Sequence, residues 1–327
     1  MKIYKEAQAI LDKINVAKNI LLFLHVNPDG DSIGSNLALA RVLEGMGKNA
    51  AIYSADEPQE NLDFLPGLEK VIREDPNKAD FEKYDLLIFL DSAEGLRVTR
   101  HDHLPVPEKL PTIVIDHHST NEGYGQVNLI DSTASSTSEI LYSLFESWKT
   151  KIDPGTANCL LAAIFSDTGT LRWATNENTL EAASQLIKNG ANLEKINFNL
   201  YSRTPLNMVK YQAEVVRRMK KEAAGKKKFL WAATSFEDIE KLGGTKIAVG
   251  GSDIGKTVEG VDFALVIREE EKGVITGSLR ARTNVDVSKI ASSLGGGGHK
   301  AAAGFSIKFE GSFNDKVGEI IEKIKSS

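Results

Sequence analysis

The feature that most constrains the fold of this chain is a series of short, continuous apolar runs separated by helical patterns. The runs occupy residues 20–24, 50–53, 86–90 and 112–115. A run of this length without polar alternation is typical of a strand that is buried on both faces. Apolar side chains recur at helical spacing in the segments between the runs, as at 33–43, so strands and helices alternate along the chain. The alternation predicts an α/β fold with a doubly wound, mainly parallel sheet.

The length of 327 residues favours two domains. We expect a catalytic domain at 1–190, a helical connector and linker at 191–228, and a smaller α/β substrate-binding domain at 229–327. The linker rests on Ala-Ala-Gly-Lys-Lys-Lys at 223–228, and strand-like runs at 228–234, 263–268 and 274–282 follow it. In the first domain, Ser136 and Glu139 have the spacing of a capping box and predict the start of a helix.

Charge and composition exclude several classes of protein. The 40 Lys and Arg against 45 Asp and Glu leave a net charge of −5, which argues against binding long duplex DNA through a basic face. The basic stretch at 217–228 is interpreted as a helix end and linker, with a nucleic-acid patch as the alternative. The apolar runs are too short to cross a membrane, residues 1–24 lack the pattern of a signal peptide, and the lone Cys159 has no disulfide partner. We therefore expect a cytoplasmic protein.

Carboxylates and imidazoles gather where the predicted strands end. The ends of parallel strands meet at one edge of an α/β sheet, so groups that are distant in sequence converge there. Four of the carboxylates would bring a charge of about −4, which two divalent ions offset, and oxygen and imidazole donors without thiolate favour Mn²⁺, Mg²⁺, Fe or Zn. Taken singly, Asp31 would be the N-cap of the following helix; taken together, the group predicts a metal site. Its members are His25, Asp29, Asp31, Asp91 and His117 after the predicted strands, and Asp167, which closes the predicted helix that contains Ile164.

The sequence resembles the DHH phosphoesterase superfamily. The four motifs of that superfamily are matched in order by His-Val-Asn-Pro-Asp-Gly-Asp-Ser-Ile-Gly-Ser at 25–35, Leu-Asp-Ser at 90–92, Asp-His-His at 116–118 and Ser-Asp-Thr-Gly at 166–169. The associated DHHA1 domain is matched by Gly-Ser-Leu-Arg at 277–280 and by Gly-Gly-Gly-Gly-His-Lys-Ala-Ala-Ala-Gly at 295–304. Family II pyrophosphatases lack a Gly-Gly-Gly-Gly-His motif in their second domain. RecJ nucleases are generally longer, with an added oligonucleotide-binding domain. The membrane-bound cyclic dinucleotide phosphodiesterases carry sensory and transmembrane segments. The resemblance is therefore to the compact bacterial NrnA type.

This resemblance implies a two-metal phosphohydrolase that degrades short oligoribonucleotides (nanoRNA) to mononucleotides and removes the 3′-phosphate of 3′-phosphoadenosine 5′-phosphate. Two divalent ions are implied, with Mn²⁺ as the first choice and Mg²⁺ or Co²⁺ as alternatives. One ion would bind His25 and Asp29, the other Asp31, His117 and Asp167, and Asp91 would bridge them. The expected partners are short single-stranded RNA and small nucleotides, not membranes, and a homodimer remains open.

The remaining residues of the site are assigned to catalysis and substrate binding. We expect Asp116 to orient His117 or hold its loop, His118 to contact a phosphoryl oxygen or protonate the leaving alkoxide, and Arg172 to reach the phosphate. Glycines let backbone N–H groups approach a phosphate, and cationic side chains beside them add donors. On this basis the substrate-binding residues are Arg280, Arg282, Gly296, Gly297, Gly298, His299 and Lys300.

Three alternative functions stay open from the sequence. A hydrolase of linear dinucleotide signals or of pyrophosphate would use the same metal ligands. A single-strand exonuclease of RecJ type would also share them. A non-catalytic nucleotide sensor is less favoured, because a binding module does not need a complete set of six ligands.

Overall fold

The computed structural model describes residues 2–173, 175–244, 251–298 and 300–326. The chain separates into two compact units, Met1–Arg203 and Thr204–Ser327, which are described one at a time. Among the described residues, no helix is both long enough and apolar enough to cross a bilayer.

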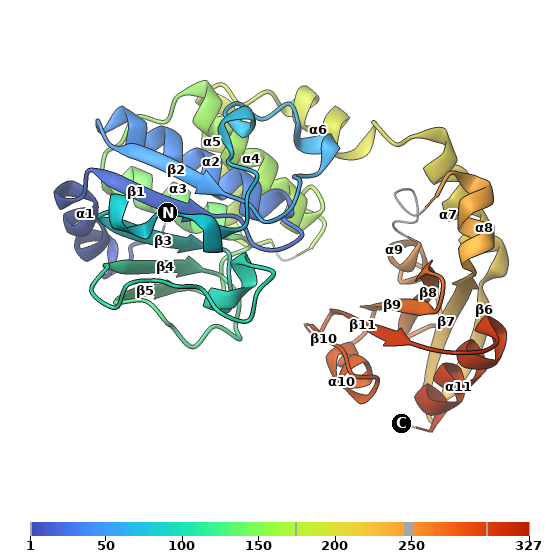
Figure 1. Ribbon diagram of the computed structural model, residues 1–327. Coiled ribbons are helices and arrows are strands. Elements are labelled where there is room, and N and C mark those ends of the chain that lie inside the picture. The colour runs from blue at the N-terminus through green and yellow to red at the C-terminus, as the bar shows by residue number, and fades with distance from the viewer. Residues whose placement is uncertain (1, 174, 245–250, 299, 327) are drawn as a thin grey trace. The chain divides into compact units, whose positions relative to one another are not determined.

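The first unit is built on a five-stranded parallel sheet in the order β2-β1-β3-β4-β5 (Figure 1). The predicted parallel α/β architecture is confirmed, and each of the four apolar runs forms a strand. The fifth strand was not predicted, because only Leu129 in it is fully buried. The strands are β1 (Asn19–Phe23), β2 (Asn49–Tyr53), β3 (Leu86–Leu90), β4 (Thr112–Asp116) and β5 (Val127–Ile130).

The two faces of this sheet are covered differently. Helices bury one face in the larger core, which includes Ile20, Leu22 and Ile88 of the strands. Short 3-10 segments and loops cover the other face, where Phe23 stacks on Phe89. The helices of this unit are α1 (Ala7–Val16), α2 (Gly30–Gly45), α3 (Thr137–Ser147), α4 (Pro154–Thr168), α5 (Glu177–Lys188) and α6 (Leu193–Tyr201).

Helices α2 and α4 approach each other closely at glycines. A Cβ atom at Gly34 would lie 2.5 Å from the backbone oxygen of Cys159, and one at Gly30 would lie 2.4 Å from Ser166. The contact matters for function because α2 carries Asp31 and α4 carries Asp167. The missing side chains therefore let two helices bring two predicted metal ligands together.

We expect Gly34→Val to lower the free energy of unfolding by about 1–3 kcal/mol, since a rigid backbone oxygen blocks the new side chain. The measurement is urea denaturation of the purified protein. Gly45→Ala is the matched control: Gly45 ends the same helix, no atom lies within 4 Å of its added Cβ, and stability should not fall. Equal stability of the Gly34→Val variant and the wild type would contradict the close-packing argument.

The second unit contains a six-stranded mixed sheet in the order β10-β11-β9-β8-β7-β6. Its largest core lies between the sheet and helices α10 and α11, and a smaller cluster packs α7 and α8 on the other face. The predicted smaller α/β domain is confirmed. The strands are β6 (Lys220–Ala224), β7 (Lys227–Thr234), β8 (Phe263–Glu271), β9 (Val274–Ala281), β10 (Gly297–Gly298) and β11 (Ala302–Lys308). The helices are α7 (Leu206–Arg218), α8 (Phe236–Leu242), α9 (Ser252–Gly255), α10 (Val287–Ser293) and α11 (Phe313–Lys325).

Two local expectations differ from the structure. Residues 223–228, expected to be a linker, form the turn region of a β6–β7 hairpin, with Gly225 at a φ of 58°. The strand β6 is polar and lies at the sheet edge, so it lacks the apolar pattern of a buried strand. Ser136 caps α3 as predicted, but the Glu139 carboxylate accepts from Ser135 instead of closing the capping box on Ser136.

Candidate metal centre

Five of the six predicted metal ligands follow the carboxyl ends of β1, β3 and β4, and the sixth, Asp167, comes from the last turn of α4. The chain leaves β1 toward β2 on one side, and β3 lies on the other side of β1, so the topological switch point falls between β1 and β3. Ligands of open α/β sheets bind in the crevice at such a point. His25 follows β1 and Asp91 follows β3 directly. The topology alone therefore places these two side chains at the expected binding crevice.

The first group of donor atoms comprises His25, Asp29 and Asp91. The Nε2 atom of His25 lies 3.6 Å from Oδ1 of Asp29 and 3.5 Å from Oδ2 of Asp91. The Nδ1 atom of His25 lies 3.0 Å from the backbone oxygen of Val26. This contact holds the proton on Nδ1 and leaves Nε2 as the donor atom for an ion, as in histidine ligands generally.

The second group comprises Asp31, His117 and Asp167. The Nε2 atom of His117 lies 3.3 Å from Oδ2 of Asp167 and 4.0 Å from Oδ2 of Asp31. These residues come from the start of α2, the loop after β4 and the last turn of α4. Three elements that are distant in sequence thus supply one compact set of oxygen and imidazole donors.

Asp91 lies between the two groups and faces both. Its Oδ2 atom is directed at His25, and its Oδ1 atom lies 3.4 Å from Nε2 of His117. The backbone of Asp91 has a φ of 53°, a left-handed conformation that costs a non-glycine residue free energy and that concentrates at functional sites. A carboxylate with one oxygen on each group has the geometry of a bridging ligand.

The amino terminus of α3 fixes the Asp31 carboxylate. The backbone N–H groups of Thr137 and Ser138 donate to its two oxygens at 2.6 and 3.1 Å, and the Ser35 hydroxyl donates at 3.0 Å. A helix amino terminus favours a negative charge, so these contacts offset part of the cost of burying the carboxylate. The two backbone partners, Thr137 and Ser138, lie more than 100 residues from Asp31, so sequence spacing gave no signal for them.

The pKa values of the histidines and carboxyl groups in this cluster reflect its excess of negative charge. Burial opposes protonation of the two imidazoles, but the neighbouring carboxylates outweigh it and raise the pKa of His25 to about 11 and that of His117 to about 10. Burial and the nearby Asp91 raise the pKa of Asp31 to about 7. Burial also raises the pKa of Asp167 well above its usual value, with repulsion from Asp31 adding to it. Protons on the two imidazoles and on Asp31 and Asp167 thus offset part of the negative charge of the cluster, and divalent ions fit the same donor set.

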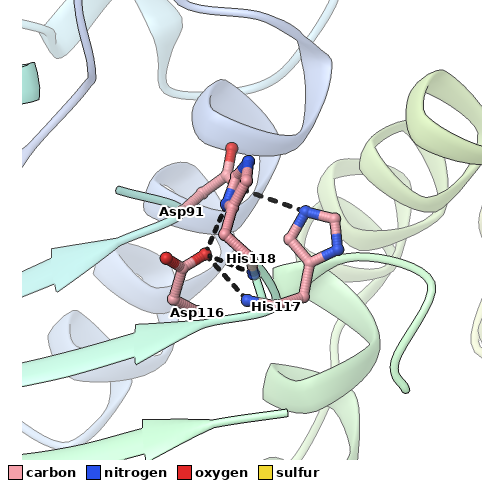
Figure 2. A group of neighbouring side chains, drawn as sticks. All are labelled: Asp91, Asp116, His117 and His118. Carbon is pink, nitrogen blue, oxygen red and sulfur yellow. Dashed lines mark hydrogen bonds and ion pairs between the residues drawn. The ribbon is translucent and has the colours of Figure 1, made fainter. Parts of the chain in front are cut away.

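Asp116 organises the loop that carries the two histidines (Figure 2). Its Oδ1 atom accepts from the backbone N–H of His117 at 2.7 Å and lies 2.7 Å from Nδ1 of His118. Its Oδ2 atom accepts from the side-chain amide of Asn121, which also donates to the backbone of Ser92 after β3. Asp116 therefore contacts the backbone of His117 and the ring of His118. Asn121 was missed by the sequence analysis, although it follows the Asp-His-His motif by only three residues.

The predicted substrate-binding residues lie on β9 and around the glycine loop of the second unit. The guanidinium of Arg280 lies 3.5 Å from Asp253 of α9 and donates to Ser278, whereas Arg282 follows β9. Added Cβ atoms at Gly296 and Gly298 would overlap β11, while Gly297 faces open space, so packing explains two of the three glycines. Lys300 is exposed, as is Arg172 in the first unit, and His299 lies outside the described residues. The roles given to these residues stay predictions.

Comparison with known proteins decides the family. Residues 19–164 match the model of the DHH family, N-terminal domain, and residues 240–326 match the DHHA1 domain. A bifunctional oligoribonuclease and PAP phosphatase, NrnA, of Thermus thermophilus is 32% identical over 88% of this chain and 84% of its own. The protein belongs to the DHH family. It is accordingly a metal-dependent phosphoesterase, a hydrolase, as the sequence predicted.

Two further relatives of this DHH protein differ in how much they share. An exopolyphosphatase-related protein from Bacteroides fragilis has a TM-score of 0.89 and 22% identity over 99% of this chain and 97% of its own, which confirms the fold. A cyclic-di-AMP phosphodiesterase of Listeria monocytogenes, PdeA, is 28% identical over 92% of this chain but only 47% of its own. The cluster of acidic and histidine side chains agrees with divalent metal binding in the family.

Proposed function

We propose that this DHH protein hydrolyses short oligoribonucleotides to mononucleotides and removes the 3′-phosphate of 3′-phosphoadenosine 5′-phosphate. The observation that carries the proposal is Asp91, whose two carboxylate oxygens face two separate groups of ligand atoms. A bridging carboxylate supports a two-ion site, which can clamp the attacking and leaving oxygens of a phosphate ester. The named activities of the Thermus relative support the choice of substrates. A cytoplasmic location is part of the proposal, since short RNA fragments arise there.

The proposed ligands divide as the two groups do. His25 and Asp29 would hold one ion, Asp31, His117 and Asp167 the other, and Asp91 both. Divalent ions bound there would neutralise the phosphate charge and lower the pKa of a water. Mn²⁺ is our first choice, because it accepts both carboxylate oxygen and imidazole. These residues would fix the reacting phosphate relative to the side chain of His118.

The second unit would bind the part of the substrate that does not react. Arg280 offers a planar fork for phosphate, and its contacts with Asp253 and Ser278 restrict its rotamers in advance. Arg282, Lys300, His299 and the glycines at 296–298 would add donors around it. The exposed Gly297 supports this role, since open space at its Cα allows close approach of a ligand.

A second candidate function is hydrolysis of cyclic or linear adenine dinucleotides, favoured by the likeness to PdeA over 92% of this chain. The match spans about half the length of PdeA.

A substrate panel tests the proposal. The purified protein, loaded with Mn²⁺, is given RNA of 2, 5 and 50 nucleotides, 3′-phosphoadenosine 5′-phosphate, pyrophosphate, and linear and cyclic adenine dinucleotides. We expect the shortest RNAs and the bisphosphate to be hydrolysed with the highest kcat/KM. Faster cleavage of the 50-mer per end would contradict the proposal, and a preference for the cyclic dinucleotide would favour the second candidate.

A further inference from the structure

We propose that the indole ring of Trp173 is a stacking surface for the nucleobase of the nucleotide whose phosphate occupies the metal centre. The inference rests on the proposed function, because a base is present only in nucleotide substrates. Trp173 lies in the turn that follows α4, a few residues after the predicted ligand Asp167.

The position of the indole is tied to Asp167. Its Nε1–H donates to the backbone oxygen of Asp167 at 2.7 Å, and the backbone N–H of Trp173 donates to Thr168. A Cβ atom added at Gly169 would fall 2.2 Å from the ring, so the ring packs directly on that glycine. The Asp167 carboxylate itself lies 3.3 Å from His117. The ring is therefore held next to a residue that reaches into the metal centre.

The backbone that carries the indole is strained in a way that fixes this position. Gly169, Thr170 and Leu171 have φ values of 55°, 60° and 64°, three successive residues in the left-handed region. Thr168 holds the turn, since its hydroxyl accepts from the N–H of Leu171 and donates to Ile164. Left-handed non-glycine residues persist only where the surroundings enforce them, and they concentrate at ligand sites. The turn is thus held in one backbone conformation within a few residues of Asp167.

Exposure separates Trp173 from the other two tryptophans. Trp173 is 45% exposed, whereas Trp148 is half-buried against the first core and Trp231 is half-buried against the second. A fixed aromatic ring with an exposed surface loses little entropy when a base stacks on it, and each stacked base contributes substantially and without sequence preference. Tolerance of sequence suits an enzyme that degrades RNA fragments of any sequence. Packing alone would not require so exposed a ring beside the ligands.

The test compares Trp173→Ala and Trp173→Phe with wild type on an RNA dinucleotide and on its abasic counterpart, with Mn²⁺ present. We expect Trp173→Ala to raise KM for the dinucleotide about 10-fold, with a smaller change in kcat and no change in KM for the abasic compound. Trp173→Phe keeps a stacking ring without the N–H and should recover most of the affinity. An equal loss of kcat in both variants would instead assign the ring to positioning Asp167 and overturn the proposal.

Binding is measured separately by tryptophan fluorescence with a dinucleotide phosphonate that the enzyme does not cleave. Stacking should quench the emission of the wild type and of the control Trp231→Phe, but not that of Trp173→Phe. Unchanged quenching in Trp173→Phe would contradict the inference. If the wild type neither binds nor hydrolyses any nucleotide, the proposed function itself fails, and that result is distinct from a wild type that is active and insensitive to Trp173.

Discussion

Asp91→Asn should lower kcat by at least about 10³-fold and leave the protein with fewer than two bound ions. Substituting a residue that only supports a metal ligand costs about 10–100-fold in activity or affinity, and Asp91 faces both groups of donors directly. Asparagine keeps the shape of the side chain but removes its charge and one of its two anionic oxygens. The ions are counted by mass spectrometry after desalting, and kcat is measured on an RNA dinucleotide.

Two variants serve as controls for this experiment. Asp29 belongs to the first group of donor atoms and not to the second, so Asp29→Asn should affect one ion and cost less than Asp91→Asn. Asp153 caps the opposite end of α4 from Asp167, and Asp153→Asn should keep both ions and full turnover. The two-ion arrangement is wrong if Asp91→Asn retains both ions and near wild-type turnover, or if wild type stays active in excess chelator after prolonged dialysis.

His118→Ala should lower kcat about 10²–10⁴-fold on RNA, the usual contribution of a general acid, with a smaller change in KM. The departing ribose alkoxide needs a proton, whereas p-nitrophenolate leaves without one. On bis-p-nitrophenyl phosphate the same variant should therefore lose far less activity. Equal losses on both substrates would show that His118 does not protonate the leaving group.

The pH dependence of kcat tests the link from Asp116 to His118. Burial opposes the charged form of His118, but the hydrogen bond to Asp116 outweighs it and raises the pKa of the imidazole. An acid acts in its protonated form, so activity is present below this pKa and is lost as the pH rises through it. Asp116→Asn removes the charge that raises the pKa, and the descending limb of the kcat profile should move to lower pH. An unmoved limb in a folded Asp116→Asn protein would rule out this role.

The elements of the first unit could be predicted from the sequence because their signals are local. A continuous apolar run such as 86–90 is typical of a strand that is buried on both faces, and the residue that follows such a strand lies at the carboxyl edge of the sheet. Glycine at the end of α4 likewise marks the helix end, where Gly169 adopts a left-handed conformation. The resemblance to the family rested on the ordered motifs, three of which follow strands and one of which ends α4.

Only the tertiary structure decided how the side chains of the site are oriented. The backbone amides that hold Asp31 come from α3, the two oxygens of Asp91 turn toward different imidazoles, and Asp116 contacts the ring of His118. The contacts of Asp31 and Asp91 depend on the packing of segments that are distant in sequence, whereas the contact of Asp116 with His118 is set by the backbone of the loop after β4. The hairpin of β6 and β7 could not be predicted from the sequence either. The polar strand β6 lies at the sheet edge, where pairing with its neighbour stabilises it without an apolar pattern of its own. Local patterns fix where a strand ends; the packing of helices around the sheet fixes which atoms meet there.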